Sequence, residues 1–159
     1  MAEDRPSLRR RLRAARRAVP ASERPAAAAA IDRAIARLGL PKPGSRIAAF
    51  EPYDGEIDPS VVLRRARRLG CRLVLVPLVG FDRRGYRLGV GGGFYDRHFA
   101  FLRHRQSWQR PILLGIAFEV QRLDHFAEQS HDVPLWGVVT ERGIYGHAAG
   151  IAGHRGEAR

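Results

Sequence analysis

The stretch from Leu73 to Arg97 most constrains what this chain can fold into. It opens with a short apolar run rich in β-branched residues, which is typical of a parallel-sheet strand covered on both faces. Four glycines follow within positions 89–93, so the backbone there can take positive φ and lie against a ligand. A helix is predicted to start at Phe94, where free N–H groups favour an anion. Strand, glycine loop and helix start together predict a phosphate site.

The glycine spacing by itself leaves a second interpretation open. The loop is not a P-loop, because no Lys-Ser/Thr pair follows it, and it is not a clean dinucleotide-binding fingerprint either. A glycine loop without a ligand therefore remains an alternative on spacing alone.

Length and composition favour one soluble domain. We expect a single α/β domain over residues 1–146, long enough to bury a core, and a flexible tail over 147–159. The single cysteine, Cys71, excludes an internal disulfide and a cysteine-rich zinc site. Apolar runs stay far below the roughly 20 residues of a membrane span, and the start of the chain lacks the apolar core of a secretory signal. We therefore expect a cytoplasmic protein with no membrane partner.

The formal net charge of +12 has two explanations. An anionic partner, either nucleic acid or a ligand with phosphates and carboxylates, would use such a surface. A compositional bias would instead leave a solvated arginine surface, and Lys42 is the only lysine among 28 basic residues. The arginines are scattered over helix faces without interleaved aromatic residues, unlike a base-stacking platform, so we favour the second explanation for most of them.

The pattern of apolar residues predicts alternating helices and strands. Helices are expected over residues 7–19 (capped by Ser7), 22–38, 58–70 (capped by Asp58) and 94–105, and strands over 46–50, 72–79, 112–117 and 136–140. The expected fold is a three-layer α/β/α arrangement with an open, mostly parallel sheet. In such sheets ligands bind at the carboxyl ends of the strands, which is where the loop from Glu51 to Asp58 and the glycine loop would lie.

Several motifs of this chain resemble those of the 5-formyltetrahydrofolate cyclo-ligase family, also called 5,10-methenyltetrahydrofolate synthetases. The main one comprises Val76-Pro77, Phe81-Asp82, Gly85, Arg87-Leu88-Gly89, Gly91 and Gly93-Phe94-Tyr95-Asp96. Weaker matches are Arg5-Pro6-Ser7-Leu8-Arg9, Glu56-Ile57-Asp58 and Val138–Ile144. Family members carry a further segment before the Leu73 strand. Its apparent absence here predicts a sheet with one strand fewer or with changed pairing, and a folate pocket lacking one wall.

The resemblance implies conversion of 5-formyltetrahydrofolate to 5,10-methenyltetrahydrofolate with ATP and Mg²⁺, releasing ADP and phosphate. It implies catalytic roles for Arg87 and Tyr95 and magnesium binding by Asp96 and Asp132. Glu51, Glu56 and Phe94 would bind the folate. The implied ATP-binding set is Arg5, Arg9, Arg87, Leu88, Gly89, Val90, Gly91, Gly92, Gly93, Phe94 and Tyr95.

Two other functions stay open. A relative without the pocket wall would bind ATP or folate without efficient turnover, and a basic nucleic-acid-binding protein is the third choice. The expected assembly is a monomer or a weak homodimer. The non-ligand explanations for the acidic residues are helix-dipole pairing for Glu56 and Asp96 and a simple turn for Asp132.

Overall fold

The computed structural model describes residues 3–40, 47–67, 73–100 and 112–146. Its main sheet has five strands in the order β1-β2-β5-β7-β8, namely Ile47–Ala48, Leu73–Val76, Ile112–Ile116, Gly137–Val139 and Ile144–Tyr145. The first four are parallel, and β8 runs antiparallel to β7. The expected α/β fold with a mostly parallel sheet is therefore confirmed.

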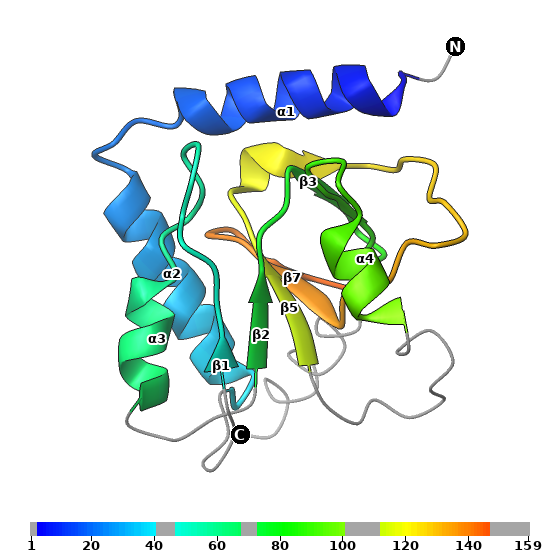
Figure 1. Cartoon of the computed structure of the whole chain (residues 1–159). Helices are drawn as coiled ribbons and strands as arrows, with labels where there is room; N and C mark the ends of the chain where they lie inside the picture. Colours follow the sequence, from blue (N-terminus) through cyan, green and yellow to red (C-terminus); the bar gives the residue numbers. More distant parts are fainter. Residues whose placement is uncertain (1–2, 41–46, 68–72, 101–111, 147–159) are drawn as a thin grey trace.

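Helices cover both faces of this sheet. The helices α2 (Arg24–Arg37) and α3 (Ser60–Arg67) lie on one side, and α4 (Phe94–His98) lies on the other (Figure 1). Alternate strand residues divide between two apolar clusters: Leu75 and Leu114 pack with α2, whereas Val76 and Leu113 pack with Phe99, the residue that follows α4. Both faces are thus apolar, as the continuous apolar strand patterns predicted.

A smaller sheet extends from the carboxyl end of β2. It pairs β3 (Gly80–Asp82) with β4 (Arg87–Leu88) in a hairpin and with β6 (Arg122–Leu123) in parallel. The strand predicted over 72–79 therefore ends earlier than expected, because β2 stops at Val76. Pro77 follows, and proline has no N–H to donate to a strand ladder. The glycine loop accordingly follows β4 and not the central strand.

Helix α1 (Arg5–Ala18) lies across the end of the molecule at which β3 sits (Figure 1). Its Leu8 and Leu12 pack on the small sheet in a third apolar cluster, with Val79, Leu88, Leu123 and Phe126. A side chain at Gly80 would collide with Leu12, which explains the glycine there. The packing fixes α1 above the carboxyl end of β2.

Two helix caps were predicted, with different outcomes. Asp58 accepts a hydrogen bond from the Ser60 N–H at 2.8 Å and caps α3 as expected. The Ser7 cap is wrong: Asp4 caps α1 by accepting the Ser7 N–H at 2.7 Å, so the helix starts two residues earlier. Aspartate and serine cap about equally well, and spacing did not separate them.

Other expectations fall outside the described residues. The tail over 147–159 and the junction at 68–72, where the resemblance implies a missing segment, both lie there. The helix expected over 94–105 is wrong in its length, because α4 ends at His98. A 3₁₀ helix at Glu119–Gln121, called η2, completes the described elements. Within the described ranges, no helix is both long and apolar enough to span a membrane.

Candidate active site

The glycine loop at residues 89–93 contains two kinds of glycine. Gly91 and Gly93 have φ of 110° and 60°, a region that residues with a side chain rarely occupy. At Gly89 and Gly92 φ is not in this region, and an added Cβ would meet nothing within 4 Å. The backbone requires glycine at 91 and 93, whereas the open space at 89 and 92 is room that a ligand approaching the backbone would use.

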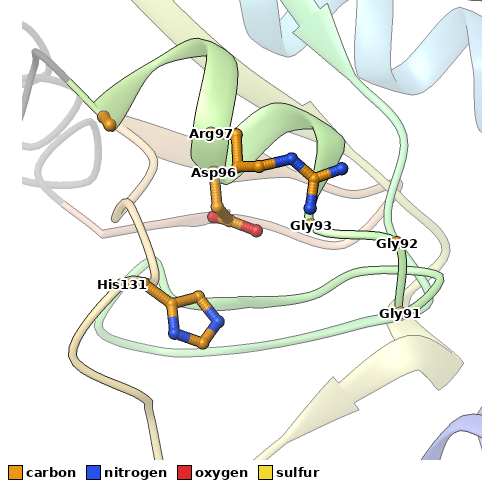
Figure 2. A pocket seen from close by; sticks show the side chains of 7 residues that line it. Gly91, Gly92, Gly93, Asp96, Arg97 and His131 are labelled. Carbon is orange, nitrogen blue, oxygen red and sulfur yellow. The ribbon is translucent and has the colours of Figure 1, made fainter.

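A pocket of about 490 Å³ lies beside this loop. Figure 2 shows Asp96 and Arg97 projecting from α4, with His131 facing them from another segment. A Cβ built on Gly93 would lie 3.2 Å from Nη1 of Arg97, so this guanidinium borders the loop. The lining residues are Gly91, Gly92, Gly93, Asp96, Arg97, Ala100 and His131.

Two arginines of α1 donate hydrogen bonds to the backbone of this loop. The Nε of Arg9 donates to the Gly89 carbonyl at 2.9 Å, and Nη2 of Arg13 donates to the Val90 carbonyl at 3.4 Å. Burial and the charges of Arg5 and Arg13 lower the pKa of Arg9, which marks a crowded cationic site. Bound anionic oxygens would relieve this crowding.

Arg5 forms an ion pair with Asp132, with 3.0 Å between Nη2 and Oδ2. Its Nε and Nη1 are buried and have no partner among the described residues. Unsatisfied buried donors cost free energy, so these N–H groups favour an acceptor that the described residues do not supply. This arrangement fits the ATP contact that the resemblance implied for Arg5.

Arg87 is buried and organises the acidic side of the site. Its Nη2 donates to Oδ1 of Asp96 at 2.6 Å, and its Nη1 donates to the Val133 carbonyl at 2.9 Å. Burial lowers the pKa of Arg87, while the charges of Asp96 and Asp132 oppose that change. Both carboxylates therefore lie close enough to act on the same guanidinium.

The Tyr95 ring faces this guanidinium, with 5.8 Å between the ring centroid and Cζ of Arg87. Burial raises the pKa of Tyr95, Arg87 opposes the rise, and the Glu56 carboxylate adds to it. The Glu56 carboxylate is therefore close enough to the start of α4 to act on the Tyr95 hydroxyl. This hydroxyl stays protonated at neutral pH.

The two aspartates fit a magnesium ion shared with a phosphate. Asp96 takes its hydrogen bonds from Arg87 and the Val133 N–H on Oδ1, and Asp132 takes its bonds from Arg5 and the Gln129 N–H on Oδ2. The other oxygen of each carboxylate accepts no hydrogen bond from the described residues. The described part of the chain has no group of three acidic, histidine or cysteine side chains that forms a metal cage. Magnesium commonly takes one or two carboxylates plus water and phosphate oxygens, which matches this pair.

Glu56 is held in the loop that follows β1. Its Oε1 accepts from Nη1 of Arg16 at 3.3 Å and its Oε2 accepts from the Tyr53 N–H at 3.2 Å. Burial raises the pKa of Glu56, although the Tyr53 N–H and Arg16 oppose the rise. A partly buried carboxylate so arranged can accept further hydrogen bonds from a ligand.

Several predicted site residues are not brought to this cluster. Leu88 needs correction, because its side chain is fully buried in the α1 cluster and its carbonyl accepts the Val79 N–H. Val90 is 65% exposed and contributes to the loop through its backbone. Glu51 is exposed, and its carboxylate accepts no hydrogen bond from a described residue. The side chain of Phe94 lies outside the described part of the structure.

The sequence interpretation missed Arg16, Arg97 and His131. Arg16 had a readable signal, since it stands four residues after Leu12 in the apolar stripe of α1 and is only 2% exposed. Arg97 and His131 had no local signal, because the pocket they line joins segments far apart in the sequence.

Residues 65–141 match the model of the 5-formyltetrahydrofolate cyclo-ligase family. That range contains the glycine loop, Arg87, Asp96 and Asp132, the residues that converge on the pocket and its acidic side. Over this stretch, which is just under half of the chain, the chain is similar to the 5-formyltetrahydrofolate cyclo-ligase family. Arg5, Arg9, Arg16 and Glu56 lie before the range that the family model matches.

Curated members of the family are similar over part of this chain. The 5-formyltetrahydrofolate cyclo-ligase of Escherichia coli K12 is 37% identical over 105 residues, which cover 64% of this chain and 50% of the relative. The enzyme of Mycolicibacterium smegmatis is 34% identical over 108 residues, 67% of this chain and 52% of the relative. The chain spans about half the length of these family members.

Solved structures support the fold. The 5,10-methenyltetrahydrofolate synthetase from Mycoplasma pneumoniae superposes with a TM-score of 0.72 at 23% identity, covering 87% of this chain and 99% of the other. That of Aquifex aeolicus gives a TM-score of 0.64 at 19% identity, covering 89% and 91%. The family and the fold therefore agree with the resemblance found in the motifs.

Proposed function

We propose that this chain is a ligase that closes 5-formyltetrahydrofolate to 5,10-methenyltetrahydrofolate, using ATP and Mg²⁺ and releasing ADP and phosphate. One observation supports this most. A glycine loop with open space at Gly89 and Gly92 lies between the arginines of α1 and the carboxylate of Asp96. Such a site suits a polyphosphate with its metal ion.

The reaction requires activation of a poor leaving group. When bound, ATP supplies the phosphoryl group that turns the formyl oxygen into a leaving group, and Mg²⁺ neutralises phosphate charge. The neighbouring folate nitrogen then closes the ring. Catalysis of phosphoryl transfer rests mainly on positioning and on charge stabilisation.

The residues of this chain have corresponding roles in the proposal. Backbone N–H groups of residues 89–93 and the guanidinium groups of Arg5 and Arg9 bind the phosphates. Arg87 holds Asp96 in place at 2.6 Å, and Asp96 with Asp132 would hold the magnesium ion. Tyr95 donates a hydrogen bond from its protonated hydroxyl, and Glu56 accepts from the folate.

The decisive experiment follows product formation. Purified full-length chain is incubated with 5-formyltetrahydrofolate and Mg-ATP, and the absorbance of the methenyl product is recorded with and without a chelator. We expect product only when both ATP and Mg²⁺ are present. Salt-sensitive binding to nucleic acid without affinity for ATP would overturn the proposal in favour of a nucleic-acid-binding protein.

A second candidate is a relative that binds its ligands without efficient turnover. The observation that favours it is the coverage of only about half of the curated relatives. Binding of ATP or 5-formyltetrahydrofolate by calorimetry, with no methenyl product over hours, would select this candidate.

A further inference from the structure

One face of α1 carries arginines to two separate loops. Arg9 and Arg13 donate to the backbone of the glycine loop, and Arg16, one turn further on, reaches the loop between β1 and α3. These residues are spaced at i, i+4 and i+7, so they share one face of the helix. The helix thereby fixes both loops at the carboxyl edge of the sheet.

Arg16 is the most buried of these side chains and has the most contacts. Its Nε donates to the Asp54 carbonyl at 3.0 Å, and its Nη2 donates to Oδ2 of Asp54 at 2.7 Å. Its Nη1 donates to Glu56 at 3.3 Å and to the Leu78 carbonyl at 3.4 Å. Arg16 therefore ties Glu56 to the end of β2.

The two carboxylates do not depend equally on Arg16. Asp54 also pairs with Arg17, so it keeps a cation when Arg16 is removed. In the described part of the chain, Glu56 pairs with Arg16 alone among the basic residues. Loss of Arg16 would thus leave a partly buried carboxylate without its counter-charge, which favours protonation or movement of Glu56.

We infer that Arg16 is a positioning residue, which orients Glu56 so that its remaining lone pairs face the folate. The inference rests on the proposed function. A reduced pterin presents adjacent N–H donors along its amino-oxo edge, and an ionised carboxylate is the acceptor that suits them. Arg16 and the Tyr53 N–H each occupy one lone pair of Glu56, and the others stay available.

Arg24, the first residue of α2, provides a matched control because it contacts the same loop. Its Nη1 donates to the Gly55 carbonyl at 2.8 Å, so it also anchors the loop to a helix. It forms no contact with Glu56 among the described interactions. If Arg16 only anchored the loop, removing either arginine would have the same effect on folate binding.

The test measures binding of 5-formyltetrahydrofolate and of Mg-ATP separately, by calorimetry, to full-length chains carrying Arg16→Met, Arg24→Met, Glu56→Gln or Arg16→Met with Glu56→Gln. We expect Arg16→Met to weaken folate binding about tenfold or more, as for a lost hydrogen bond to a charged group, and ATP binding less than about threefold. Arg24→Met should stay within about threefold for both ligands. The double variant should bind folate no more weakly than Glu56→Gln alone.

Three outcomes would overturn the inference: equal effects of Arg16→Met and Arg24→Met, unchanged folate binding in Arg16→Met, or additive losses in the double variant. If Arg16→Met fails to fold, Arg16→Lys replaces it in the same cycle, because lysine keeps the charge with fewer donors. Folate binding by Arg16→Lys should then lie between wild type and Glu56→Gln. A wild-type chain that binds neither ligand would contradict the proposed function itself, which separates the two failures.

Discussion

Gly91 and Gly92 are neighbours in one loop, yet they are glycine for different reasons. Gly91 has φ of 110°, and the Arg9 guanidinium lies 3.6 Å from the place of its Cβ. Gly92 is open, so the fold alone would accept a side chain there. A pair of alanine substitutions therefore separates the demands of the fold from those of a ligand.

We expect Gly92→Ala to weaken ATP binding about tenfold, because its methyl group takes the space of a phosphate oxygen, and to leave the melting temperature unchanged. Gly91→Ala should also cost about 1–2 kcal/mol of folding free energy through its positive φ. Calorimetry and thermal unfolding of both variants make the comparison. Loss of stability without loss of ATP affinity in Gly92→Ala would instead support a loop with no ligand.

Asp96 supports a second prediction. We expect Asp96→Asn to lower turnover by at least about tenfold, roughly 1.4 kcal/mol of transition-state stabilisation, because a magnesium ligand is lost. The substitution also breaks the pair with Arg87, so unfolding in urea must be measured beside kcat. Asp124→Asn, at an exposed carboxylate, is the control. Unchanged activity across a magnesium titration would remove Asp96 from the metal site.

The ionisation of Glu56 gives a pH prediction. Burial raises the pKa of Glu56, and the charged groups that act on it are Arg16, which opposes the rise, and Asp54, which adds to it. Since the ionised form accepts hydrogen bonds, folate affinity should fall as pH drops through this raised pKa, at a higher pH than an ordinary glutamate would cause. Titrations at a series of pH values should show the loss in wild type and none in Glu56→Gln, and the same profile in both would contradict the assignment.

At the scale of elements, length decided what the sequence could predict. The strands β1, β2, β5 and β7 and the helices α1 to α3 were anticipated, with ends displaced by a few residues, because each lies in a longer apolar pattern of the sequence. The strands β4, β6 and β8 have two residues each and were not predicted. Their positions are set by pairing partners distant in the sequence.

Helix α1 is the element on which both loops depend. Leu12 is 1% exposed and anchors the helix to the small sheet, so Leu12→Ala should lower the free energy of unfolding by about 2–5 kcal/mol. The variant should also bind ATP and folate more weakly, since Arg9 and Arg16 move with the helix. Urea denaturation and calorimetry test both, with the exposed Arg10→Ala as a control expected within about 0.5 kcal/mol. Lower stability with full affinity for both ligands would show that the two loops keep their conformation without α1, which would contradict this prediction.

At the scale of the whole molecule, the motifs predicted the family and the fold class. They did not predict how the site is assembled. Arg5 meets Asp132 and Arg9 meets Gly89 across 127 and 80 positions of sequence, and such contacts follow from the placement of α1 on the small sheet. Local patterns carry no information about that placement, and they likewise left Leu88 among the ligand residues.

The segment that the resemblance implies is missing before Leu73 would have a measurable consequence. If a wall of the folate pocket is absent, Mg-ATP should bind with ordinary affinity, whereas 5-formyltetrahydrofolate should bind weakly, turn over slowly and be accompanied by self-association through exposed apolar surface. Calorimetry for each ligand and light scattering on the same sample test this expectation. Tight folate binding by a monomer would contradict it.

Many of the arginines described here donate hydrogen bonds to backbone carbonyls and not only to side chains. Arg9, Arg13, Arg16, Arg24 and Arg87 donate to the carbonyl oxygens of Gly89, Val90, Asp54, Leu78, Gly55 and Val133, among others. A carbonyl is present whatever residue occupies the position. A substitution at an exposed position such as Val90 therefore leaves in place the carbonyl that accepts the hydrogen bond from Arg13.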